Sequence, residues 1–143
     1  MKAFGRILLA VVAGMALAFV LVVLVEWFIS IVHPFPADFD GNIPEHVKRY
    51  PHWVLAVAAL FWGATIAAAT WVASRIGGLP AAIVVTLLLG WALTFNLTAL
   101  PYPPWFKITM FTVFPIACYL GFRYGRRAFS SATATAVSDA IVN

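Results

Sequence analysis

The chain has 143 residues, of which 64% are hydrophobic and 10% are charged, and its mean hydropathy is +0.97. Soluble domains are about 45–50% apolar and about 25% charged. One small core cannot bury this excess, because a domain of such length still exposes about a third of its surface. The composition therefore excludes a soluble monomer and a disordered chain, and it predicts an integral membrane protein. The net charge of +4 is spread along the chain and does not indicate nucleic-acid binding.

Four apolar runs follow one another along the chain, each long enough to cross a hydrocarbon core of about 30 Å. They predict an all-α, four-helix transmembrane bundle with spans at 4–31, 51–74, 80–100 and 104–124. Proline opens the last three spans, which suits a first helical turn. Gly77 and Gly78 predict a tight hairpin between the second and third spans. We expect a membrane domain over 1–128, with an outer loop at 32–50, and a tail at 129–143.

The basic residues predict the orientation of the bundle, since Lys and Arg concentrate on the cytoplasmic side. Six of the nine would lie on one side: Lys2, Arg6, Arg75, Arg123, Arg126 and Arg127. The opposite side would hold Lys48, Arg49 and Lys107. We therefore expect both termini in the cytoplasm and a multi-pass protein of the inner membrane.

Glu26 is the only acidic residue inside an expected span. A carboxylate in hydrocarbon is costly and suggests a functional or paired role. Lys107 and Asn96 are expected at a similar depth, so we predict an ion pair between Glu26 and Lys107 that Asn96 caps. A cluster of this kind could instead only fix helix packing, or Glu26 could extend to the interface.

Three histidines are expected on the outer face, namely His33, His46 and His52. Together with a carboxylate they could bind a metal ion. However, Glu26 and His33 are about 10 Å apart along a helix axis, too far to share an ion. We therefore expect the histidines to cap the loop, and we predict no metal site, no cofactor and no catalytic residue.

Small residues recur at every fourth position on several of the expected helices. The glycines among them are Gly14, Gly63, Gly121 and Gly125. Such residues let helix backbones approach closely in lipid, where no hydrophobic effect drives association. They predict packing faces inside the bundle, a seam of a homo-oligomer, or a surface for a partner membrane protein.

Three functions remain open. The leading hypothesis is a non-catalytic accessory or structural subunit that packs against membrane-protein partners in the bilayer, because the spans carry few polar groups. The second is a small oligomeric transporter or channel with Glu26 as its ionisable group. The third is a membrane enzyme acting on a lipid or quinone, with Glu26 and either His33 or His52 as an acid–base pair.

Several short motifs together carry a resemblance to a known group of proteins. They are Glu26, the HPFP sequence at 33–36, Pro51, Asn96, the PYPPWF sequence at 101–106, Pro115 and Gly121. On these motifs residues 5–125 resemble a group of small bacterial four-helix membrane proteins without a known activity. The resemblance implies a bacterial inner-membrane protein, and it implies no substrate, cofactor or catalytic residue.

Overall fold

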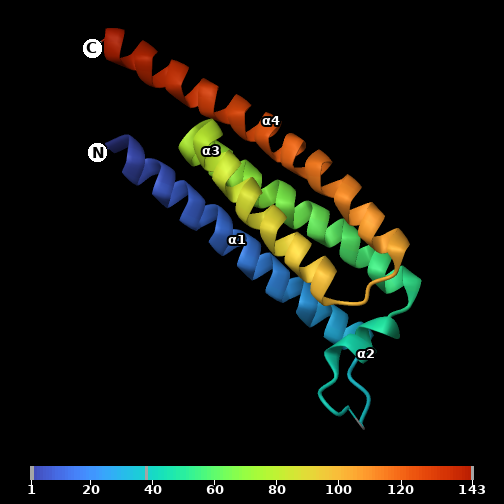
Figure 1. Ribbon diagram of the computed structural model, residues 1–143. Coiled ribbons are helices and arrows are strands. Elements are labelled where there is room, and N and C mark those ends of the chain that lie inside the picture. Colours follow the sequence, from blue (N-terminus) through green and yellow to red (C-terminus); the bar gives the residue numbers. More distant parts are fainter. Residues whose placement is uncertain (1, 38, 143) are drawn as a thin grey trace.

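The computed structural model describes residues 2–37 and 39–142, and it describes the side chains of 3–37 and 39–126. The ends of the expected domain and tail, residues 1 and 143, lie outside the described residues, as does residue 38. Four helices follow in chain order: α1 (Lys2–Val32), α2 (Ile43–Lys48), α3 (His52–Ala99) and α4 (Pro104–Val142). Every regular element of the described chain is a helix, as Figure 1 shows. The all-α class is confirmed.

Three of the helices are long and apolar enough to cross a membrane: α1 over Ala3–Val32, all of α3, and α4 over Pro104–Arg126. The sequence predicted four spans at this point. The difference arises in α3, which contains both the second and the third expected spans. Helices of this length and hydropathy nevertheless support the prediction of a membrane protein.

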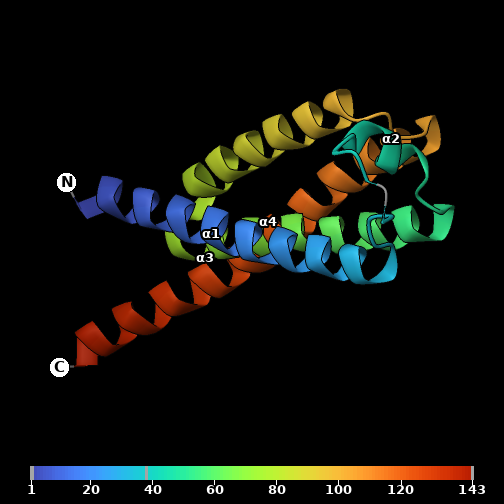
Figure 2. The same cartoon turned by 90° about the horizontal axis from the view of Figure 1, so that it is seen from below.

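A sharp bend divides α3 at Gly78, whose backbone angles are φ 70° and ψ −157°. Glycine alone adopts this conformation readily, and Pro80 follows it in the first turn of the next helical segment. The first arm of α3 (52–77) and its second arm (79–99) fold back on each other (Figures 1 and 2). One core cluster accordingly joins Leu55 of the first arm to Leu97 of the second.

The two arms of α3 form the centre of the bundle, with α1 on one side and α4 on the other. Within the described residues, no Cα atoms of α1 and α4 lie within 8 Å of each other. At Gly14 of α1, a Cβ atom would lie 3.0 Å from the Ala69 carbonyl oxygen and 3.3 Å from Val85. Glycine at this position therefore lets α1 contact both arms.

Close contacts also join α4 to the first arm of α3. A Cβ atom on Gly121 would collide with the carbonyl oxygen of Ala67, and one on Gly125 would lie 2.6 Å from Ser74 Oγ. A Cβ atom on Gly63 would lie 2.8 Å from Val113 of α4. The predicted packing glycines thus all lie at contacts between helices within one copy of the chain.

The N-terminus, the bend of α3 and the far part of α4 lie at one end of the bundle, and α2 lies at the other (Figure 1). At the first of these ends, Arg6 Nε donates a hydrogen bond of 2.6 Å to the Ile76 carbonyl oxygen. This carbonyl is in the last turn before the bend, where intrahelical donors are missing. The guanidinium therefore ties α1 to the hairpin of α3.

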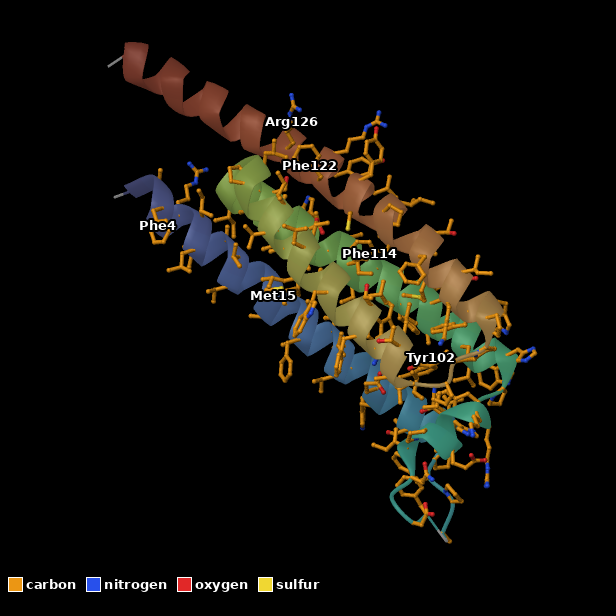
Figure 3. The ribbon with its side chains drawn as sticks, viewed as in Figure 1. Phe4, Met15, Tyr102, Phe114, Phe122 and Arg126 are labelled. Atoms are coloured by element: carbon orange, nitrogen blue, oxygen red, sulfur yellow. The ribbon has the colours of Figure 1, made fainter. Side chains whose placement is uncertain are left out.

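The outward surface of the spanning helices is apolar. Large side chains such as Phe19, Leu60 and Trp91 are 70%, 74% and 74% exposed, and Figure 3 shows such side chains projecting away from the bundle. Water-soluble monomers rarely expose apolar patches beyond a few hundred Å². The structure therefore fits a surface that is solvated by lipid.

The expected tail is helical in the structure, because α4 continues without a break to Val142. The last turns of α4 extend past the bundle (Figures 1 and 2). The side chains of this extension lie outside the described residues.

Candidate functional site

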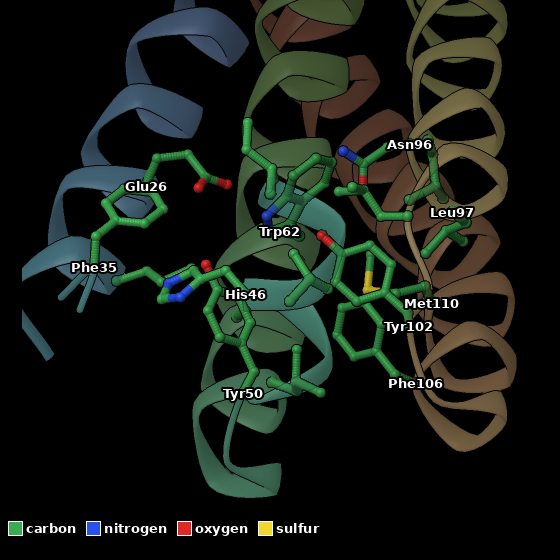
Figure 4. Close-up of a pocket in the computed structure, with 17 residues that line it drawn as sticks. Glu26, Phe35, His46, Tyr50, Trp62, Asn96, Leu97, Tyr102, Phe106 and Met110 are labelled. Atoms are coloured by element: carbon green, nitrogen blue, oxygen red, sulfur yellow. The ribbon is translucent and has the colours of Figure 1, made fainter. Parts of the chain in front are cut away.

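A cavity of about 260 Å³ lies at the end of the bundle that holds α2. Its walls come from α1, α2, both arms of α3, the turn at 100–103 and the start of α4. The polar side chains at its wall are Glu26, His46, Tyr50, Trp62, Asn96 and Tyr102, and Figure 4 shows them around the same space. Groups that are far apart in the sequence thus converge on one cavity.

Glu26 and Asn96 approach the cavity from opposite walls. Glu26 is on the last part of α1, and its carboxylate points into the cavity toward Trp62 (Figure 4). Asn96 is near the end of the second arm of α3. These two residues of the predicted cluster thus line one cavity.

The predicted ion pair between Glu26 and Lys107 is not formed. The described residues include an ion pair of 3.0 Å between Lys48 and Glu45, and no ion pair is found between Glu26 and Lys107. Lys107 is in α4 and does not line the cavity. Since α4 packs on α3 and not on α1, equal depth did not place the lysine beside the carboxylate.

Two tyrosines complete the polar wall. Burial raises the pKa of Tyr102 above its ordinary value of 10.0, and the neighbouring acidic groups of Glu26 and Tyr50, when ionised, act in the same direction. The pKa of Tyr50 is raised by burial and then by Glu26. Both phenols therefore stay protonated at neutral pH, and they can donate hydrogen bonds inside the cavity.

The segment 39–50, which includes α2, closes one end of the cavity, and together with 33–37 we name it the outer cap. The short α2 begins because the Asn42 side-chain oxygen accepts a hydrogen bond of 3.1 Å from the backbone N–H of Glu45, as an N-cap residue does. The inward face of α2 buries His46 and Val47. Capping at its N-terminus thus fixes which side chains close the cavity.

His46 is the centre of an aromatic cluster in the outer cap. Its ring stacks on His33 with centroids 4.9 Å apart and lies 4.5 Å from Phe35 and 5.2 Å from Tyr50. His52 lies elsewhere, 5.6 Å from the ring of Trp105. The three predicted outer-face histidines are thus divided into a stacked pair and a single residue.

The described residues contain no group of three His, Cys, Asp or Glu side chains that could hold a metal ion. The acid–base pairs that the sequence suggested are also not assembled. Neither His33 nor His52 lines the cavity with Glu26, whereas His46 does. The arrangement is therefore a polar cavity with aromatic walls, suited to binding.

Burial is the main cause of a lowered pKa at His46, whose ordinary value is 6.5. The nearby positive groups of His33 and Arg49 lower this pKa further, and a hydrogen bond to the His33 backbone opposes them. The ring is therefore neutral at pH 7. The outer cap packs around an imidazole that resists protonation.

We expect the outer cap to loosen as the pH falls below about 6.5. Below this pH His46 binds a proton in the unfolded cap but not in the folded one, where it is buried. The stability that the neutral His46 gives to the outer cap is therefore complete above about pH 6.5 and decreases as the pH falls toward the lowered pKa of His46. Hydrogen exchange over 33–50, corrected for intrinsic rates, would show less protection at pH 5.5 than at pH 7.5. His46→Phe should abolish the difference and the control His52→Phe should keep it. Equal pH sensitivity in His46→Phe and the wild type would contradict the assignment.

Sequence reasoning missed most of the aromatic wall, including Tyr50, Trp62 and Tyr102. A signal was present for Trp62, because residues 55, 58 and 62 share one face of a helix, and Leu55, Ala58 and Trp62 all line the cavity. The two tyrosines are in connecting segments, whose path the spacing of residues does not predict.

A second hollow of about 360 Å³ lies between α1 and the first arm of α3. Its wall is apolar except for Thr65 and contains no titratable side chain. Although it is larger than the cavity at Glu26, it offers no recognition group beyond one hydroxyl. Its surroundings match a groove filled by lipid chains.

The chain matches no protein-family model, no curated protein and no solved structure. The resemblance to small bacterial four-helix membrane proteins therefore stays a prediction from sequence motifs.

Proposed function

We propose that this chain is a non-catalytic, solute-binding protein of the bacterial inner membrane, which crosses the bilayer four times with both termini in the cytoplasm. The observation that carries the proposal is the convergence of Glu26, Asn96, Tyr50 and Tyr102 on one cavity at the cap end of the bundle. A cavity with apolar walls and a few converging polar groups is the usual form of a small-molecule site.

The four crossings are supported by the bend of α3. A straight helix of 48 residues would extend about 72 Å, more than twice the hydrocarbon thickness. The two arms would instead extend about 39 Å and about 32 Å, and each is sufficient for one crossing. With α1 and α4, this gives an even number of spans, in agreement with the six basic residues expected on the terminal side.

Cysteine labelling of intact cells would test this topology in a Cys118→Ala background. With four crossings, cysteines at Asp40 and Pro104 both react with a membrane-impermeant maleimide, and a cysteine at Leu79 reacts only after permeabilisation. If α3 crossed once, Asp40 and Pro104 would label from opposite sides. That result would overturn both the span count and the proposed orientation.

Binding at the cavity would be tested by filling it. We expect small solutes from a fragment panel to raise the melting temperature of the protein in nanodiscs, and Ala58→Phe to abolish these shifts. Ala58 lines the cavity and is buried. The matched control is Ala56→Phe, on the exposed side of the same arm. Asn96→Leu offers a second, isosteric change should Ala58→Phe fold poorly. Shifts that persist in both cavity variants would contradict the proposal.

Transport would require more than this cavity. Within the described residues, the buried polar side chains toward the other end of the bundle are few, namely Thr65, Thr70 and Ser74. A single copy therefore offers little lining for a polar path, and a channel or transporter using Glu26 would have to be an oligomer.

An accessory subunit is the second candidate, and the course of α4 past the end of the bundle favours it (Figure 2). Most helices in proteins are stabilised by packing against a neighbour, and a partner membrane protein would supply such packing for this part of α4. We expect a stop codon after Ala128 to release a partner that co-purifies in mild detergent. Retention of the partner by the shortened chain would exclude the extension as its contact.

A further inference from the structure

We infer that the solute bound in the cavity at Glu26 is a small organic cation, an ammonium group carried on an apolar body. The inference rests on the proposed function and adds the chemical class of the ligand. Three features of the cavity support it: the sign of its charge, its aromatic walls and its unpartnered acceptors.

The cavity wall carries one carboxylate, that of Glu26, and no lysine or arginine. The wall also contains the imidazole of His46, which is neutral at pH 7 because burial lowers its pKa. A positive group is therefore attracted to the cavity and an anion is repelled. In the described part of the chain, no ion pair satisfies the Glu26 carboxylate, which leaves this role to a ligand.

Aromatic rings surround the space that the carboxylate faces. Phe35, Tyr50, Trp62, Tyr102 and Phe106 all contribute to the wall, and the Glu26 carboxylate points toward the indole of Trp62 (Figure 4). The negative face of such rings attracts ammonium groups, most strongly where water is excluded. A carboxylate beside several rings therefore favours a cation over a neutral solute of the same shape.

Hydrogen-bond acceptors are also available for ammonium protons. Within the described residues, the side-chain amide of Asn96 makes no hydrogen bond among those that the structure gives, and only its backbone oxygen accepts one, from Leu100. The amide oxygen can accept a hydrogen bond from the ligand. The phenolic oxygens of Tyr50 and Tyr102 can accept in the same way.

The volume limits the size of the ligand. Sites for drug-sized molecules measure about 300–1,000 Å³, and this cavity has about 260 Å³. Leu55, Leu93 and Leu97 supply the apolar part of the wall. An amine with one ring or a short alkyl chain matches both the volume and the lining.

Three compounds of one shape and different charge test the inference by calorimetry on the full chain in zwitterionic nanodiscs. The probes are 2-phenylethylammonium, 2-phenylethanol and 3-phenylpropanoate. We expect the ammonium to bind at least about tenfold more tightly than the alcohol, and the carboxylate not to bind. Glu26→Gln should weaken the ammonium at least about tenfold and leave the alcohol nearly unchanged. The matched control Glu45→Gln, in the exposed pair with Lys48, should behave as the wild type.

The outcomes separate this inference from the proposed function. Alcohol or carboxylate binding as tight as that of the ammonium, and lost in Ala58→Phe, would overturn the cation class and leave the cavity as a binding site. An ammonium preference that persists in Glu26→Gln would also overturn it. If none of the probes binds, the cation class fails, and the proposed function fails with it only when the fragment panel also gives no shift.

Discussion

Replacing Gly121 by alanine is expected to lower the free energy of unfolding by about 1–3 kcal/mol, the usual cost of adding a methyl group to a filled contact. The new Cβ would meet the carbonyl oxygen of Ala67 and lie 3.0 Å from the Cβ of Thr70. A backbone oxygen cannot rotate away as the end of a long side chain can. The two helices must therefore separate, and α4 loses contact along its length.

Unfolding in mixed micelles, followed by circular dichroism as SDS is added, would measure this change. Gly5→Ala is the matched control, because a Cβ at Gly5 of α1 would meet no atom within 4 Å beyond its chain neighbours and the adjacent backbone of its own helix. We expect Gly5→Ala to change stability by less than about 1 kcal/mol, with any gain due to helix propensity. Equal stability of the Gly121→Ala and Gly5→Ala proteins would show that the α3–α4 contact is looser than described.

Gly125→Ala extends the argument along the same contact. Its Cβ would lie 2.7 Å from the Trp71 carbonyl oxygen and 2.6 Å from Ser74 Oγ. Because one displacement of α4 relieves both collisions, the double substitution should cost less than the sum of the single ones. Such coupling is expected for residues that share one contact.

The packing glycines were predictable because spacing along a helix places them on one face. Spacing also places Glu26 and Asn96 at one depth. Depth gives a position along the bundle axis and not around it, and this is why Lys107 was wrongly paired with Glu26. Lys107 is on α4, and the two arms of α3 separate α4 from α1.

The outer cap was the least predictable part of the site. His46 reaches the cavity because the chain turns back after α1, through Gly41 with φ 87°, and enters the capped helix α2. Contacts of this kind depend on the path of a loop. A loop has no repeating geometry, so the spacing of its residues does not predict which side chains meet. The stacking of His33 on His46 was therefore outside what the sequence could predict, although their presence on one face was expected.

The hairpin of α3 was predicted from Gly77, Gly78 and Pro80, and the bend is found at Gly78. Its two arms are helical segments that meet at the single non-helical residue Gly78, and together they make up α3. Counted in this way, three helices of the described chain are long and apolar enough to cross a membrane, while the number of crossings remains a proposal.

Gly78→Ala is the second substitution with a large expected effect, about 1–3 kcal/mol of lost stability. Its cause differs from that at Gly121. A Cβ on Gly78 would meet only Pro80, at 4.0 Å, so the loss comes from backbone strain at φ 70° and ψ −157° and not from collision. The same SDS titration, again with Gly5→Ala as control, would measure it.

The strain at position 78 could be relieved if α3 straightened, and under the proposed topology the bilayer would prevent this. A straight helix of 48 residues would extend about 72 Å, far beyond a hydrocarbon core of about 30 Å. It would also separate Leu55 from Leu97 and open the cluster beside the cavity. We therefore expect Gly78→Ala to keep the labelling pattern of the wild type while losing stability. A Gly78→Ala protein that is as stable as the wild type would mean that the bend is made elsewhere in 75–80.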